Sequence, residues 1–260
     1  MTVYPSVRDV GVEICRAAGY TVETFDDPGR APAVATPGAE SPGLVDDPRP
    51  VAIEPLTEAD VDPAGVVPRL AGALEDDRDC LFVVPDPGED DAVASVVASV
   101  LSTPTALAAD APEGRQFYSG PDRIPLSDGS YACARAPAAD LRWREVAVGA
   151  DRPRLELSVG DEVLAVLADV DALATPDRAS FRHAYARTDE GRFAVTERGE
   201  VVAEFGGVTA MRRGGYTPVA MPLVPEHLFP PGSDPGRSWA VCTAREDPVV
   251  YGPDGRSQWA

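Results

Sequence analysis

The apolar residues in the first half of the chain recur at two spacings, one typical of helices and one typical of strands. Helical spacing predicts helices within 6–18, 66–74 and 90–100. Alternating or wholly apolar short runs predict strands at 20–25, 51–56, 80–84 and 105–108. The run at 80–84 is apolar throughout, which is typical of a strand buried on both faces. Because strands and helices alternate after residue 51, we expect a small, mostly parallel α/β layer.

The segment 26–49 interrupts this alternation. It contains several glycines together with Pro28, Pro32, Pro37, Pro42 and Pro48. Proline fixes φ and lacks a backbone donor, so this composition disfavours regular structure. We expect a long loop or a flexible, Pro/Gly-rich insertion here.

After residue 112 the pattern changes to short strands separated by turn residues. The clearest series is a meander with strands at 181–187, 192–197 and 200–205. A last strand is predicted at 239–243. We therefore predict the α/β fold class with two domains. A small, mostly parallel α/β domain over 1–112 is followed by a β-rich, largely antiparallel domain over 113–260.

The charge of the chain is unusual. It has 43 acidic residues and 23 basic residues, all of them arginine, which gives a net charge of −20 and a pI near 4.4. In molar salt the Debye length falls to about 3 Å, so clustered carboxylates repel one another weakly and still hold water and cations. A high-GC genome also replaces lysine by arginine, but it does not account for the acidic excess. We therefore expect a halophilic protein from an archaeal cytosol.

The sequence contains no zinc or nucleotide-binding motif and no membrane-spanning run. Cys15, Cys80, Cys133 and Cys242 lie too far apart in sequence for a zinc pattern or a small disulfide framework. Cys133 or Cys242 could act as a nucleophile only beside a base in space. No Gly-rich nucleotide loop follows a strand, and a Walker loop requires a lysine. Since no apolar run reaches 18 residues and no signal-peptide core is present, we expect a cytoplasmic location.

Two places could carry chemistry if the protein is an enzyme. The loop over 85–91, after Val84, holds four carboxylates at the carboxyl end of a predicted strand, where α/β sheets bind ligands. Such oxygens could hold Mg²⁺, although acidic loops are also ordinary surface in a salt-adapted protein. The other place is His183, a weak catalytic candidate that shares a strand face with Phe181 and Tyr185. We would expect the enzyme's cleft to lie between the two halves.

The stretch 205–245 departs from the acidic character of the chain. It carries only Glu226 and Asp234 as acidic residues, against four arginines. In an acid-coated protein such a stretch is either buried or covered by a partner. Arginine and tyrosine are enriched at protein interfaces. We hypothesise contact with a protein partner or a second copy through Arg212, Arg213, Tyr216, Met221, Leu228 and Phe229.

Nucleic acid is a competing partner for this stretch. Arg212 and Arg213 could meet phosphates, and Tyr216 could stack on a base. The net charge of −20 opposes this, and attraction to phosphate falls steeply with salt. We therefore do not expect nucleic acid. The leading hypothesis is a non-catalytic, cytosolic module for protein binding or self-association, with an enzyme and a nucleic-acid-binding accessory protein as alternatives.

Overall fold

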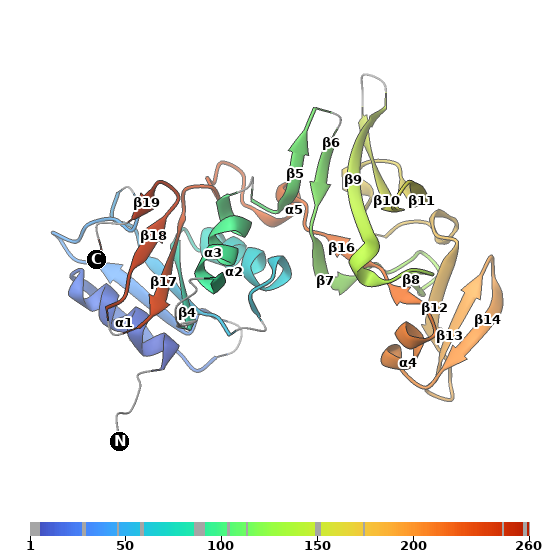
Figure 1. Cartoon of the computed structure of the whole chain (residues 1–260), viewed down its shortest axis with the longest axis horizontal. Coiled ribbons are helices and arrows are strands. Elements are labelled where there is room, and N and C mark those ends of the chain that lie inside the picture. The colour runs from blue at the N-terminus through green and yellow to red at the C-terminus, as the bar shows by residue number, and fades with distance from the viewer. Residues whose placement is uncertain are drawn as a thin grey trace. The chain divides into compact units, whose positions relative to one another are not determined.

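The computed structural model describes residues 6–27, 30–45, 47–57, 60–85, 92–102, 105–112, 114–148, 152–173, 175–245, 247–256 and 259. The chain folds into two compact units, both drawn in Figure 1. The first unit comprises Met1–Ala106 together with Pro225–Ala260. The second unit, Leu107–Val224, is therefore inserted into the sequence of the first.

A mixed seven-stranded sheet forms the centre of the first unit (Figure 1). Its strand order is β1-β2-β3-β4-β17-β18-β19. The strands are Tyr20–Thr24, Ala33–Pro37, Val51–Pro55, Asp79–Pro85, Trp239–Ala244, Val250–Gly252 and Gly255–Arg256. β4 pairs in parallel with β3 and with β17, whereas the other neighbouring strands pair antiparallel.

Helices cover both faces of this sheet. They are α1 (Val7–Ala17), α2 (Pro63–Glu75) and α3 (Ala92–Ser102), and the first unit also contains the short α5 (Pro225–Leu228). α1 begins after Ser6, whose side chain accepts a hydrogen bond from the N–H of Asp9. The apolar side of α1 shares a core with Ile53 of β3 and Val83 of β4. Because side chains alternate along a strand, Glu54 lies on the opposite face, where α2 and α3 pack.

The fold class predicted from the sequence is wrong. The protein is β-rich, with several mostly antiparallel sheets, and is not a small, mostly parallel α/β domain followed by a β domain. Among the described strands, parallel pairing is confined to β3, β4 and β17, and β17 comes from the 113–260 segment assigned to the second domain. β2 was missed because Pro32 precedes it and Pro37 ends it, inside the 26–49 segment expected to be a loop.

Two five-stranded antiparallel sheets and a two-stranded ribbon make up the second unit. One sheet has the order β11-β10-β9-β6-β5, with strands Glu162–Leu167, Arg152–Val159, Leu141–Val148, Gly114–Phe117 and Leu107–Ala111. The other has the order β14-β13-β12-β8-β15, with strands Glu200–Phe205, Phe193–Glu197, His183–Arg187, Tyr131–Ala134 and Thr217–Pro218. The ribbon pairs β16 (Ala220–Pro222) with β7 (Ser119–Arg123). The predicted meander is confirmed as β12, β13 and β14.

Short helical turns connect these strands. They are α4 (Val208–Arg213) and the 3₁₀ turns η2 (Ala138–Asp140), η3 (Val170–Leu173) and η4 (Arg178–Ser180). One apolar cluster joins the two sheets and contains Trp143 and Leu157 from one and Ala184 from the other. Fully burying a large apolar side chain such as Leu157 stabilises a fold by about 1.5–3 kcal/mol. The buried indole of Trp143 donates its N–H to the carbonyl oxygen of Ala220 at 2.9 Å, so its polar atom is satisfied.

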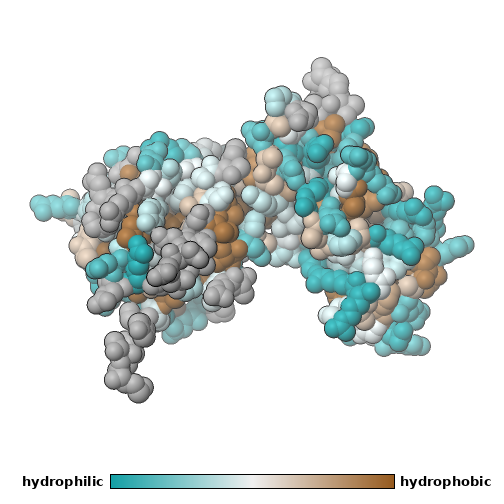
Figure 2. Space-filling view, viewed as in Figure 1, coloured by the Kyte–Doolittle hydropathy of each residue, from teal (hydrophilic) through white to brown (hydrophobic). Residues whose placement is uncertain are grey.

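Within the described ranges, no helix has both the length and the apolar character needed to cross a membrane. On the face shown in Figure 2, hydrophilic side chains cover much of the second unit, with smaller hydrophobic areas between them.

Candidate functional site

Three side chains with titratable groups lie in one row across the second unit's β12-containing sheet. In the antiparallel register, His183 of β12 is opposite Cys133 of β8 on one side and Glu197 of β13 on the other. Residues directly opposite each other in antiparallel strands project from the same face. The fold therefore places a thiol, an imidazole and a carboxylate on neighbouring strands, although they are far apart in sequence.

A cavity of about 300 Å³ lies beside this row. Its polar lining comes from Cys133, Arg135, Glu162, Arg182 and His183. Its apolar lining comes from both sheets and consists of Ala134, Leu157, Val163, Leu164 and Phe181. The volume is at the lower end of the range of about 300–1,000 Å³ that is usual for small-molecule pockets.

Glu197 contacts both Arg182 and His183, which line this cavity. Its Oε1 accepts a hydrogen bond from Nε of Arg182 at 2.8 Å, and its Oε2 lies 3.6 Å from Nε2 of His183. The hydrogen bond from Arg182 is the main reason that the pKa of Glu197 is lowered. Glu197 is therefore an ionised carboxylate at neutral pH.

His183 is neutral at neutral pH. Only 8 % of it is exposed, and this burial lowers its pKa, while Glu197 acts in the opposite direction. The His183 ring also meets the ring of Tyr216 edge-on, with the centroids 5.6 Å apart. A neutral imidazole can donate one hydrogen bond and accept another.

The row does not form an activated nucleophile. Cys133 is buried, and burial raises the pKa of its thiol to about 12. A nucleophilic cysteine must reach the thiolate form, usually through a lowered pKa. The structure thus brings Cys133 and His183 together but keeps the sulfur protonated.

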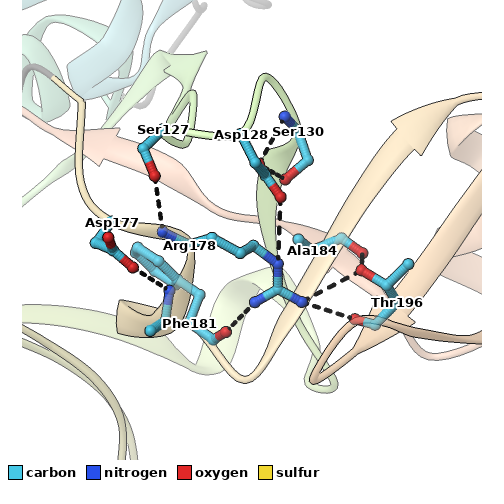
Figure 3. A network of polar contacts seen from close by, with 9 residues as sticks. Ser127, Asp128, Ser130, Asp177, Arg178, Phe181, Ala184 and Thr196 are labelled. Carbon is cyan, nitrogen blue, oxygen red and sulfur yellow. Dashed lines mark hydrogen bonds and ion pairs between the residues drawn. The ribbon is translucent and has the colours of Figure 1, made fainter.

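A polar network around Arg178 holds the chain that enters β12 (Figure 3). The Arg178 guanidinium donates to the carbonyl oxygen of Phe181 and to both the carbonyl oxygen and the hydroxyl of Thr196. Its Nε lies 3.9 Å from a carboxylate oxygen of Asp128. The N–H of Arg178 itself donates to the hydroxyl of Ser127 at 3.2 Å. Phe181, which lines the cavity, is thereby fixed to β13.

The predicted contact residues of 205–245 are divided between the two units. Arg212 and Arg213 are exposed at the end of α4, and Tyr216 is buried in the cluster that also contains Met211. Met221 is partly buried against the core of the second unit. Leu228 and Phe229 belong to the first unit, where both are partly buried.

Sequence reasoning found His183 but missed the groups around it. Arg135 and Glu197 carry no sequence signal, because only the register of β8, β12 and β13 brings them close. Of the acidic loop over 85–91, only Pro85 lies within the described residues. Among the residues that the structure describes, no three His, Cys, Asp or Glu side chains are placed to hold a metal ion.

Comparison with known families, with curated proteins and with solved structures found no match for this chain.

Proposed function

We propose that the second unit binds a small organic anion in the cavity beside His183. The supporting observation is that the exposed Arg135 lines this cavity and has no acidic partner in the described part of the chain. A guanidinium binds a carboxylate or phosphate through two parallel hydrogen bonds. Arg182 adds a second cation, although Glu197 already neutralises part of its charge.

The walls of the cavity suggest the chemistry of the rest of the ligand. Leu157, Leu164 and Phe181 offer apolar surface, whereas the polar side chains include Arg135 and His183. A ligand with a charged head and a small apolar body satisfies both kinds of surface. The neutral His183 would accept or donate one further hydrogen bond and so help to orient this ligand.

This site is a cavity inside one unit rather than the expected cleft between the two halves. Its chemistry also favours binding over nucleophilic catalysis, because Cys133 is held as a thiol. The protein would then act as a sensor or carrier of the anion.

The test is to titrate benzoate and hexanoate into the protein in molar KCl and to follow the backbone amide signals of Ala134 and Arg182 by NMR. We expect both signals to shift, and we expect Arg135→Gln to weaken binding about tenfold. That loss is near the low end of the ~1.5–3 kcal/mol range for charge-assisted hydrogen bonds, because Arg135 is exposed and salt screens its charge.

Arg212→Gln is the matched control, since it removes an exposed arginine of the same unit away from the cavity lining. It should leave benzoate affinity unchanged. Sulfate, which lacks an apolar part, should bind more weakly than benzoate. Equal loss of affinity in the two arginine variants would show a diffuse charge effect and would remove the support for this site.

A second candidate function is contact with a protein partner or a second copy through the face formed by α4 and β14. Arg212 and Arg213 are exposed there. β14 is an edge strand whose Val201 and Val202 are 59 % and 43 % exposed. Unpaired edge strands with exposed apolar side chains are sites where another chain can add. For the cellular setting, the acidic, lysine-free composition supports our proposal of a haloarchaeal cytosol.

A further inference from the structure

Glu54 is a buried acidic residue in the central strand region of the first unit. It lies on β3 with 9 % of its surface exposed, in a run of four buried residues. Its Oε2 is 3.6 Å from Nε of Arg69, and within the described ranges its carboxyl group makes no hydrogen bond. Burying a carboxylate without hydrogen bonds destabilises a folded protein, so a gain in stability does not explain an acidic residue at this position.

A cavity of about 290 Å³ lies beside this carboxyl group. Arg30, Arg69 and Arg78 all line it, together with Asp76. Its remaining lining residues are small or compact, and a Cβ atom added at Gly72 would meet nothing within 4 Å. The cavity therefore lies next to Glu54 and is lined by three arginines.

The three arginines are held in place by the protein. The Arg30 guanidinium lies over the ring of Phe25, 4.4 Å from its centroid. Arg69 donates to the carbonyl oxygen of Gly65 at 2.7 Å and to a carboxylate oxygen of Asp60 at 3.1 Å. Because these side chains are already held in place, ligand binding costs little further side-chain conformational entropy.

The third arginine, Arg78, forms an ion pair with Asp76, with 2.6 Å between Nη1 and Oδ2. Counting Asp60, which pairs with Arg69, three arginines face three acidic side chains, so the group is neutral while Glu54 is ionised and carries a charge of +1 once Glu54 is protonated. The first unit as a whole is strongly acidic, so a cluster with as many arginines as acidic side chains contrasts with the rest of the unit.

We propose that this cavity binds a compact oxyanion of the sulfate or phosphate type and that protonation of Glu54 switches the binding on. A protonated carboxyl group donates a hydrogen bond to an anion oxygen, whereas a carboxylate only accepts and repels the anion. Three guanidinium groups supply the remaining donors. This site is independent of the one in the second unit.

The surroundings of Glu54 place this switch near neutral pH. Burial raises its pKa to about 7, and Arg69 from α2 lowers it in part. From β4, the buried Cys80 stays a neutral thiol because burial raises its pKa, and the buried Asp79 adds a carboxyl group nearby. Asp60, just before α2, stays ionised because hydrogen bonds from Thr57 lower its pKa. Arg30, Asp76 and Arg78 are the remaining charged neighbours.

Affinity for the anion should fall as the pH rises. Below the pKa of Glu54 the protonated form dominates and the anion binds. Above that pKa, binding must also take up one proton, so affinity falls about tenfold per pH unit.

The test uses sulfate as the probe, because sulfate keeps its charge between pH 6.5 and 8.5. It is titrated into the full-length protein in KCl at constant ionic strength, while the amide signals of Ala52 and Ala73 are followed by NMR. Wild-type affinity should fall at least tenfold over this range. Glu54→Gln, which keeps a hydrogen-bond donor and has no charge, should bind sulfate equally at both pH values.

Glu75→Gln is the matched control, because it removes an exposed acidic residue at the end of α2 without touching the cavity lining. It should keep the wild-type pH dependence. Failure of sulfate to shift Ala52 and Ala73 at pH 6.5, or an unchanged pH dependence in Glu54→Gln, would overturn the proposal.

Phosphate and glycerol 3-phosphate, compared at pH 6.5, identify the source of the oxyanion. Tighter binding of glycerol 3-phosphate supports a phosphate group on a larger metabolite. Equal or tighter binding of phosphate supports a free oxyanion. Absence of binding by both, together with no response to sulfate, leaves Glu54 and Arg69 as an ion pair of purely structural value and refutes the site.

Discussion

Tyr216 and Arg213 lie three residues apart but have opposite environments. Tyr216 is 8 % exposed, and its ring lies 6.1 Å from that of Phe205. Arg213 is exposed. We expect Tyr216→Ala to lower the free energy of unfolding by about 3 kcal/mol, because it leaves a cavity among packed aromatic side chains. Guanidinium chloride unfolding in molar KCl measures this loss.

Arg213→Glu should change stability by less than about 0.5 kcal/mol, since exposed positions contribute little. If the α4 and β14 face binds a second copy, the same variant should shift the sedimentation coefficient toward the monomer. Sedimentation identical to wild type would argue against self-association through this face. Tyr216 was expected to contribute to such a contact, but its burial gives it a role inside the unit.

His183 could be singled out from the sequence because the chain contains only two histidines. Its neighbours Arg135 and Glu197 could not, because they meet His183 through strand pairing that no local pattern encodes. Glu54 gave no signal either. It sits in the strand predicted at 51–56, and an acidic residue within a halophilic sequence is unremarkable until its burial is known.

At the scale of elements, two helical glycines make a matched pair. A Cβ at Gly11 of α1 would lie 2.7 Å from methyl carbons of both Ile53 and Val83, whereas one at Gly72 of α2 would meet nothing. Gly11→Ala should therefore destabilise the protein by about 1–2 kcal/mol through overpacking. Gly72→Ala should stabilise it by about 0.5–1 kcal/mol, because alanine favours the helix. Thermal unfolding of both variants checks the signs, and two shifts in the same direction would contradict this difference in packing.

The sequence predicted most helices and strands but not how the strands pair. Apolar runs correctly indicated β3 and β4, and a run at 239–243 indicated β17. β17 nevertheless joins β4 across a long separation in sequence. Periodicity reports which face of a strand is buried, but it carries no information about its neighbour. The fold class was missed for this reason.

At the scale of the whole molecule, the charge is divided unevenly. The second unit holds 18 acidic residues and 14 arginines, which leaves 25 acidic residues and 9 arginines in the first. Lowering KCl from molar to 0.1 M lengthens the Debye length from about 3 to about 10 Å, which strengthens repulsion between carboxylates. The first unit should therefore lose stability before the second.

Hydrogen exchange of the amides in β3 and β13 measures the two units separately. Exchange in β3 should accelerate at a higher KCl concentration than exchange in β13. Loss of protection in both strands at the same concentration would contradict the uneven response. Protection that does not depend on KCl would also count against adaptation to high salt.

The position of β17 beside β4 has a consequence for biosynthesis. The ribosome completes β4 early, and it must then translate the whole of Leu107–Val224 before β17 emerges. Until that moment β4 lacks one of its two parallel neighbours, so it has an unpaired backbone edge beside apolar side chains. The second unit can therefore fold first, because the sheet of the first unit is incomplete until β17, β18 and β19 are translated. A nascent chain halted before residue 239 should consequently be a good client for chaperones that shield apolar strand edges.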